Sequence, residues 1–161
     1  MSNYITSCLQ EAAPEVDRVR TLAAEYLANK FSMITDPYQM AITTFALHRA
    51  AHTKAGEAFT AFRNMNRTDE HLYWSAVEIP KNPSSTEQTR IVMEVREKDE
   101  TQGQALRATC YGLMLFLERI NEGFEFAKPI VSWIRTQPNA LFGWDSTQDT
   151  LLVMEVRNFL S

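Results

Sequence analysis

The stretch that decides the fold joins a glycine turn to the start of a helix, Gly143-Trp144-Asp145-Ser146-Thr147-Gln148-Asp149-Thr150. Ser146 is a favoured N-cap residue, and Asp149 stands three residues later, where its carboxylate can reach back to the cap. Asp145 and Asp149 also place negative charge at the positive end of the helix dipole. An amphipathic run from Leu151 to Leu160 follows. We therefore predict a well-capped last helix behind a tight turn.

Upstream of this turn the chain begins with two helical patterns. We predict a short first helix from Tyr4 to Glu11, which Pro14 interrupts. Pro14 also suits the first turn of a second helix that ends near Lys30, where a positive charge favours the last carbonyls. The second helix has an apolar side made of residues at helical spacing, namely Val16, Val19, Leu22, Ala23, Tyr26 and Leu27.

Asp36 marks the clearest helix start in the first half of the chain. It is a good N-cap, Pro37 suits the first helical position, and Gln39 completes a capping box. This third helix is apolar over much of its circumference, which is typical of a helix buried on several sides. A fourth helix, Lys54 to about Met65, follows a short loop, so we expect the two to pack antiparallel.

The helical pattern then gives way to extended segments. Leu72–Ile79 and the β-branched run Thr89–Arg96 flank a proline-rich loop, Pro80–Ser85. Two extended runs around such a loop predict a β-hairpin inserted between helices.

Thr101 begins the second half as the predicted N-cap of a fifth helix, Gln102 to about Ile120. Ala108 and Gly112 lie four residues apart in this helix and would let another helix approach closely. Gly123 suits the C′ position that ends it.

A sixth helix follows, with Pro129 in its first turn, where proline is tolerated. The apolar-rich third, fifth and last helices alternate with the more polar second, fourth and sixth. This alternation predicts an inner and an outer layer in a curved helical array. The predicted fold class is all-α with one inserted β-hairpin, and 161 residues fit one ordinary domain.

Charge and composition narrow the classes of partner. The net charge is −4 and the basic residues are scattered, which argues against a nucleic-acid surface. No run is long and apolar enough to span a membrane. The first residues lack the basic region and apolar core of a signal peptide, which favours a cytosolic protein or a chain cut from a larger one.

No reactive constellation emerges from the motifs, so we assign no catalytic, cofactor-binding or metal-binding residue. His48 and His52 have the i, i+4 spacing that can hold zinc, but no Glu stands between them and no further ligand is evident. We interpret both as surface or rim histidines, and His71 has no predicted partner. Buried structural roles are predicted for the two cysteines and three prominent aromatics, Cys8, Cys110, Tyr111, Trp133 and Trp144.

Asn66-Arg67-Thr68 matches the N-glycosylation pattern. It falls at a predicted exit from helix to loop, where a sugar can be accommodated. The pattern alone leaves the occupancy of Asn66 open.

Several stretches together resemble one family, the thioester domain of alpha-macroglobulin and complement proteins, which includes insect thioester-containing proteins. The resemblance covers nearly the whole chain, in the family's order: Asp36–Leu47, Asp69–Trp74 with the following hairpin, Ala108–Leu115, Ile130–Gln137 and Gly143–Thr150. It implies an α/α toroid of inner and outer helices, in agreement with the two predicted layers. It also implies that residues 1–161 form a single partial domain, matching the C-terminal half of the toroid.

The resemblance extends to the scaffold and leaves out the reactive centre. The family's thioester joins the Cys and the Gln of Gly-Cys-Gly-Glu-Gln, whereas Cys8-Leu9-Gln10 has the wrong spacing and Cys110 is followed by Tyr-Gly-Leu. We carry no reactive residue over, and His48, His52 and His71 receive no thioester-tuning role.

The resemblance therefore implies a non-enzymatic fragment that is extracellular with the remainder of a larger parent chain. That parent would trap proteases, as an endopeptidase inhibitor, or tag microbial surfaces in innate immunity. A partial toroid would expose helix faces and so associate or dissolve poorly.

Two other classes remain open. One is a toroid enzyme, such as a prenyltransferase subunit or a terpenoid cyclase, because Gln137 followed by Gly143-Trp144 loosely echoes the repeats of those cyclases. Against it, the sequence has no Asp-rich acid motif and no evident Asp/Cys/His zinc set. The other is an intracellular helical binding module. Stoichiometric zinc in the purified chain would favour the enzyme.

Overall fold

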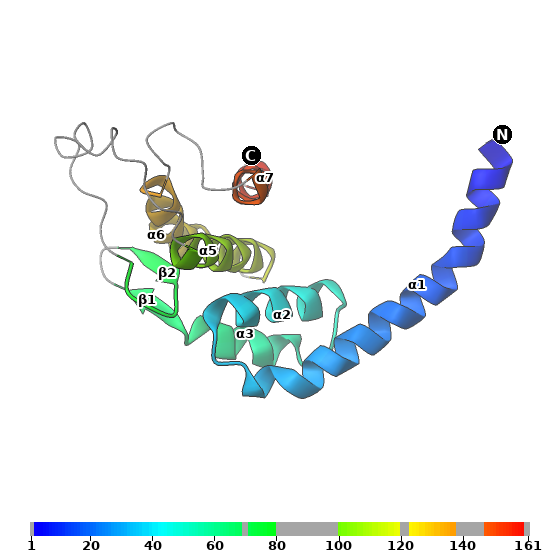
Figure 1. The fold of residues 1–161 in the computed structure, drawn as a ribbon, viewed down its shortest axis with the longest axis horizontal. Coiled ribbons are helices and arrows are strands. Elements are labelled where there is room, and N and C mark those ends of the chain that lie inside the picture. The colour runs from blue at the N-terminus through cyan, green and yellow to red at the C-terminus, as the bar shows by residue number, and fades with distance from the viewer. Residues whose placement is uncertain (1, 69–70, 80–99, 120–122, 138–146, 160–161) are drawn as a thin grey trace.

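A computed structural model describes residues 2–68, 71–79, 100–119, 123–137 and 147–159. Helices dominate it, and a single small antiparallel sheet interrupts them within the described residues (Figure 1). This arrangement confirms the predicted all-α class with an inserted hairpin. The elements in chain order are α1 (Ser2–Lys30), the short 3-10 helix η1 (Phe31–Met33), α2 (Pro37–Arg49), α3 (Ala55–Arg63), β1 (Asn66–Thr68), β2 (Leu72–Trp74), α5 (Glu100–Arg119), α6 (Gly123–Arg135) and α7 (Thr147–Phe159).

The helices form the two layers that the apolar patterns predict. Helix α5 lies between α2 and α7, and these three make the inner row (Figure 1). Helix α3 packs on α2, α6 packs on α5, and the C-terminal part of α1 meets α2. Of the apolar-rich helices, α2 and α5 have neighbours on several sides, since burying apolar surface stabilises the fold in proportion to its area. Helix α7 packs on α5.

A chain of aromatic rings fills the space between α3, the sheet and α5. Trp74 stacks on Phe62 with ring centroids 4.7 Å apart and lies 5.8 Å from Phe116, which in turn meets Phe59 edge-on at 5.2 Å. Trp74 also donates its indole N–H to the carbonyl of Phe62 at 2.9 Å. Fully burying a large apolar side chain contributes roughly 1.5–3 kcal/mol, so this cluster is a main source of stability.

The prediction that Pro14 separates two helices is wrong. The structure has one continuous helix from Ser2 to Lys30, with Pro14 inside it, in place of two helices. A proline removes one intrahelical hydrogen bond, and the helix nevertheless continues through Pro14 into residues 14–23, which are all exposed. Figure 1 shows α1 leaving the packed helices as a long arm.

The first turn of α2 has the predicted N-cap and the predicted proline. Asp36 is the N-cap, Pro37 is the first helical residue, and Asp36 Oδ1 accepts a hydrogen bond from the backbone N–H of Gln39 at 2.8 Å. All three residues lie within four consecutive positions, and this is the kind of local device that a sequence pattern specifies well.

The observed hairpin uses a different first strand from the predicted one. Leu72–Trp74 is a strand, as expected, but its partner in the described part of the chain is Asn66–Thr68, which was predicted as a helix exit. The predicted run Thr89–Arg96 lies outside the described residues. Trp74 pairs with Asn66, the first residue of β1, so the ladder ends there. Beyond it, the side chain of Arg67 donates to the carbonyls of Ser75 and Ala76, at 2.9 and 3.0 Å.

Three details of α5 and α6 differ from the predictions. Helix α5 already includes Glu100, so Thr101 is a helical residue and not the N-cap; an acidic residue is favourable so near a helix start. Gly123 belongs to α6, and Pro129 consequently lies in the interior of α6. The helix continues through this proline because residues on both sides of it are buried: Ala127, Ile130, Trp133 and Ile134. The packing of this apolar face outweighs the lost hydrogen bond.

Gly112 permits a close approach, but to a side chain and not to a helix. A Cβ at Gly112 would lie 2.9 Å from Cζ3 of Trp74 and 3.1 Å from Cζ of Phe62. The missing side chain therefore makes room for the indole ring at the centre of the aromatic cluster.

Candidate functional site

An ion pair joins the stretch at the start of α7 to the central helix. Arg107 Nε lies 2.6 Å from Asp149 Oδ1, and Arg107 Nη2 lies 3.5 Å from Oδ2. Asp149 is 1% exposed and Arg107 is 26% exposed. Asp149 stands in the first turn of α7 and so also complements the helix dipole, as predicted. Ser146, its predicted capping partner, lies outside the described residues.

Aromatic and sulfur groups surround this pair. The guanidinium carbon of Arg107 lies 5.9 Å from the centre of the Tyr38 ring. The hydrogen bond to Asp149 raises the pKa of Arg107, so the cation is fixed. Burial, assisted by the negative charge of Asp149, raises the pKa of the Cys110 thiol to about 12. Burial, assisted by Tyr38, raises the pKa of Tyr111.

This arrangement can hold two helices together, and it has little capacity for chemistry. Cys110 is buried and stays protonated at neutral pH, whereas the nucleophilic form of a cysteine is the thiolate. The carboxylate of Asp149 is occupied by a guanidinium that cannot give up its proton. We therefore interpret the site as a structural tie between α5 and α7.

Sequence reasoning identified Asp149 but missed Arg107 as its partner. A signal was present, since Arg107 is the one charged residue between Ala105 and Leu117 in an otherwise apolar stretch. A lone charge on a helix that is buried on several sides requires a partner. Its partner lies 42 residues away in sequence, on a different helix.

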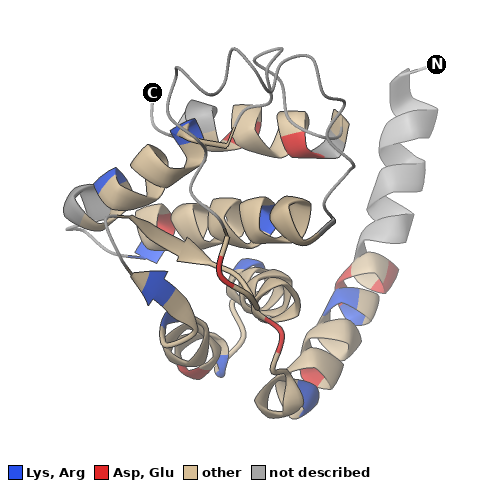
Figure 2. Ribbon diagram, turned by 60° about the vertical axis from the view of Figure 1, so that its left-hand side comes forward, with Lys and Arg blue, Asp and Glu red and all other residues tan. Residues whose placement is uncertain are grey.

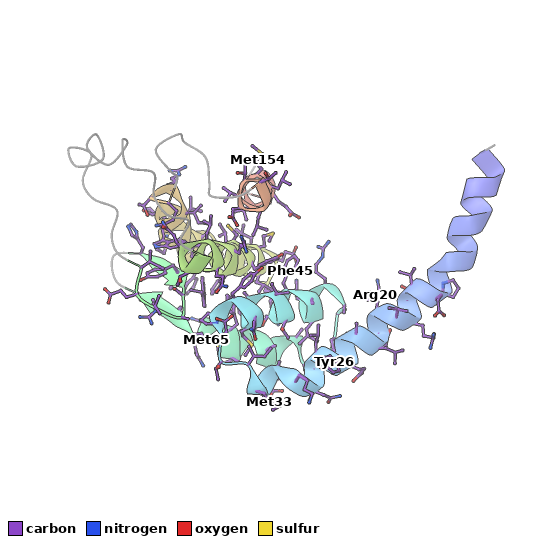
Figure 3. The ribbon with its side chains drawn as sticks, in the orientation of Figure 1. Arg20, Tyr26, Met33, Phe45, Met65 and Met154 are labelled. Carbon is purple, nitrogen blue, oxygen red and sulfur yellow. The ribbon has the colours of Figure 1, made fainter. Side chains whose placement is uncertain are left out.

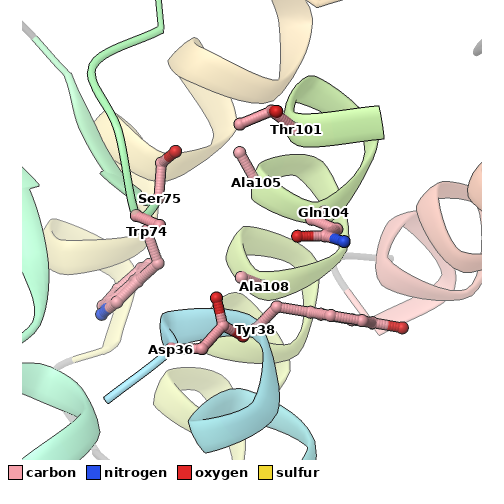
Figure 4. Close-up of a pocket in the computed structure, with 9 residues that line it drawn as sticks. Asp36, Tyr38, Trp74, Ser75, Thr101, Gln104, Ala105 and Ala108 are labelled. Atoms are coloured by element: carbon pink, nitrogen blue, oxygen red, sulfur yellow. The ribbon is translucent and has the colours of Figure 1, made fainter. Parts of the chain in front are cut away.

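A shallow hollow lies beside the start of α2, the end of β2 and the first turns of α5 (Figure 4). Its empty volume is about 200 Å³, part of which is open solvent. Small-molecule sites are usually larger, roughly 300–1,000 Å³, and more enclosed. The hollow is lined by Asp36, Tyr38, Trp74, Ser75, Ala76, Thr101, Gln104, Ala105 and Ala108. The carboxylate of Asp36 already caps α2, so the hollow suits water better than a substrate.

His48 and His52 each contact a different neighbouring helix. His48 Nε2 lies 2.8 Å from Glu118 Oε2 on α5, and His52 Nε2 lies 3.3 Å from Glu25 Oε1 on α1. The backbone N–H of Lys54 donates to Nδ1 of His52, which occupies its other ring nitrogen. Across the described residues, no group of three or more His, Cys, Asp or Glu side chains is placed to hold a metal ion.

The remaining residues singled out in the sequence have packing roles where they are described. Trp133 is 4% exposed and stacks on Tyr73 with ring centroids 4.9 Å apart. Tyr111 packs against Phe45 at 5.2 Å. The side chains of Cys8 and Trp144 lie outside the described part. None of the helices in the described ranges is long and apolar enough to cross a membrane.

Comparisons with known proteins identify the family of this chain. The family model of the A-macroglobulin TED domain, that is the thioester domain, matches residues 1–156. Complement C3 from Lethenteron camtschaticum is 30% identical over 96% of this chain, and ovostatin from Gallus gallus is 27% identical over 96%. The chain spans 9% and 10% of the length of these two relatives. On the match to residues 1–156, the chain belongs to the A-macroglobulin TED domain family.

Proposed function

We propose that this chain is a non-enzymatic, wall-forming part of a thioester domain in a larger protein of the alpha-macroglobulin and complement type. Residues 1–161 would be a single partial domain, and the rest of the toroid would belong to the parent chain. The chain's small share of the length of its relatives supports this view. The single observation that carries it is an apolar surface on α1 that has no partner among the described residues.

This surface, which we call the α1 stripe, consists of four residues that are each more than half exposed: Val16 61%, Val19 54%, Leu22 57% and Tyr26 64%. They recur at the three-to-four-residue spacing of one helix face. Ala24 and Ala28, which are buried against the body of the protein, lie on the other side of the same helix. Helix α1 therefore has two apolar sides. Figure 3 shows Tyr26 on α1, pointing away from the packed helices.

The natural occupant of the α1 stripe is another apolar helix face of the parent. A solvent-exposed apolar patch of this kind usually marks an interaction surface. In a layered helical array each helix is covered by its neighbours, and the side of α1 that carries the stripe is uncovered in the described structure.

The chemistry of the chain supports a scaffold role in place of an acylating one. Gly-Cys-Gly-Glu-Gln does not occur in the sequence, and Cys110 is buried and protonated at neutral pH. In the described part of the chain, Lys and Arg are spread over several elements together with Asp and Glu and do not gather on one face (Figure 2). This distribution supports the proposal that nucleic acid is not a partner, since nucleic-acid binding requires a basic surface. The parent, in this proposal extracellular, would act on proteases or microbial surfaces.

Sequencing the transcript upstream of the codon for Met1 tests the proposal. We expect an in-frame continuation that encodes Gly-Cys-Gly-Glu-Gln ahead of this chain. An in-frame stop codon directly upstream, in the mature transcript, would show that the chain is made without a thioester segment and would contradict the proposed role.

A further inference from the structure

The tripeptide Asn66-Arg67-Thr68 forms the whole of strand β1, directly after α3. It is the one Asn-x-Ser/Thr pattern in the 161 residues with an acceptable middle residue, because Asn82-Pro83-Ser84 carries proline at the excluded position. The Arg63–Thr68 segment therefore combines a modification pattern with a defined local geometry.

Strand β1 lies on the outside of the sheet. It pairs with β2 on one side, whereas β2 packs against α5 and α6 (Figure 1). Thr68 is exposed and Asn66 is half-buried. In the described residues the sheet has two strands, so the other edge of β1 is not paired. A bulky group attached at this edge meets no packed helix layer.

The side-chain hydrogen bonds of Asn66 are compatible with a substituent on its nitrogen. Asn66 Nδ2 donates to the carbonyl of Arg63 at 2.6 Å, and Asn66 Oδ1 accepts from the hydroxyl of Thr68 at 2.8 Å. A primary amide nitrogen carries two hydrogens, and the bond to Arg63 uses one. A glycosylated amide keeps one N–H, which is the number that the bond to Arg63 needs, and Oδ1 keeps its acceptor role.

We propose that Asn66 is an N-glycosylation site when the chain passes through the secretory pathway. The inference rests on the extracellular part of the proposed function. The co-reactant is an oligosaccharide carried on a lipid pyrophosphate. Nδ2 of Asn66 attacks the anomeric carbon, the new N–C bond forms, and the C–O bond to the lipid pyrophosphate breaks with its electron pair leaving on the pyrophosphate. One amide proton is lost to a base of the transferring enzyme, and no atom changes oxidation state.

A glycan at this position would also protect the sheet. An exposed strand edge offers unpaired backbone groups to other chains and promotes aggregation. A bulky, solubilising sugar on β1 would block strand addition there. The glycan thus fits a protein that circulates outside cells.

The test expresses the full chain behind a heterologous signal peptide in a eukaryotic cell line. Occupancy is measured in cell lysate and medium together, by digestion with peptide-N-glycosidase and by mass spectrometry of the Asn66 peptide, in which release of the glycan converts Asn66 to Asp. Thr68→Val removes the hydroxyl at nearly constant shape, and Thr68→Ser keeps the pattern. Unfolding of the same three proteins made in bacteria, without glycan, checks that the variants fold.

We expect a glycosidase-sensitive gain in mass for the wild-type chain and for Thr68→Ser, and its loss in Thr68→Val. An unmodified Asn66 in the wild-type chain, or a modification that persists in Thr68→Val, would overturn the site. Because lysate and medium are both analysed, poor secretion cannot be mistaken for absence of the glycan. An unmodified Asn66 would refute the glycosylation site and would leave the proposed thioester-domain role intact. That role would be refuted by the transcript test, through an in-frame stop codon directly upstream.

Discussion

Arg107 on α5 and Asp149 on α7 hold their Nε and Oδ1 atoms 2.6 Å apart, although 42 residues separate them in sequence. Asp149 is almost fully buried by this contact. The last helix is therefore tied to the central helix by a charge pair. The pair sits at one end of the inner row of helices and ties α7 to that row.

Replacing Arg107 by Met should destabilise the protein by about 3 kcal/mol, because it leaves the carboxylate of Asp149 buried without its cation. The free energy of unfolding from urea titrations measures this loss. Arg18→Met is the matched control, since the Arg18–Glu15 pair has a similar distance of 2.7 Å but lies in solvent. We expect no measurable change there. Equal effects of the two substitutions would refute the structural importance of the buried pair.

Gly112→Ala should destabilise the protein by roughly 1–2 kcal/mol. The new Cβ would lie 2.9 Å from Trp74, and overpacking a core costs about 1–3 kcal/mol, which exceeds the gain of up to about 1 kcal/mol in helix propensity. Gly103→Ala in the same helix is the control. Its Cβ meets its nearest neighbours at 3.7 Å and 3.8 Å, so it should be neutral or slightly stabilising. Thermal unfolding of the wild type and of both variants measures these changes. A Gly112→Ala variant that is as stable as the wild type would contradict the close packing of Gly112 against Trp74.

Cys110 should make stability fall with pH above 9. The folded-state pKa is raised from 9.0 to about 12, so between these values the unfolded chain loses the thiol proton while the folded chain retains it. The contribution is fully present below pH 9 and is lost at up to about 1.4 kcal/mol per pH unit above it. The difference in unfolding free energy between wild type and Cys110→Ala, measured from pH 8 to pH 11, isolates this slope. A constant difference would show that the thiol ionises normally in the folded protein.

The α1 stripe should drive self-association of the isolated chain. Exchanging Val19 and Leu22 for Gln removes apolar surface that is already exposed, so association should weaken without loss of unfolding free energy. Sedimentation velocity over a range of concentrations measures the association. Val77→Gln, at a residue that is 50% exposed and follows β2, is the control. Association that Val77→Gln weakens as much as the double variant would argue against a specific role for the stripe.

The sequence predicts the parts of this fold that depend on neighbouring residues or on helical period. Asp36 and Pro37 form the N-cap and the first residue of α2 as predicted, because a cap involves positions within a single turn. The two layers agree with the alternation of apolar-rich and polar helices, and the apolar-rich α2 and α5 have several neighbours each. The resemblance to thioester domains, carried by Gly143–Thr150 and the stretches before it, points to the family that the comparisons confirm.

The parts that the sequence did not reveal depend on distant partners. Pro14 and Pro129 are local breakers, but both helices continue through them, and at Pro129 an apolar face is buried on both sides of the proline. Gly112 gives no sign in sequence that its neighbour is the indole of Trp74. Arg107 is conspicuous as a lone charge, but only the packing of α7 on α5 shows that Asp149 is its partner.

The central claim is that this chain is a wall of a thioester domain within a larger extracellular protein. The most direct test is an immunoblot of the cells that express it, and of their medium, with an antibody raised against the chain. We expect the antibody to detect a secreted polypeptide far larger than the 18.5 kDa of this chain. A sole product of 18.5 kDa that remains inside the cells would contradict the account.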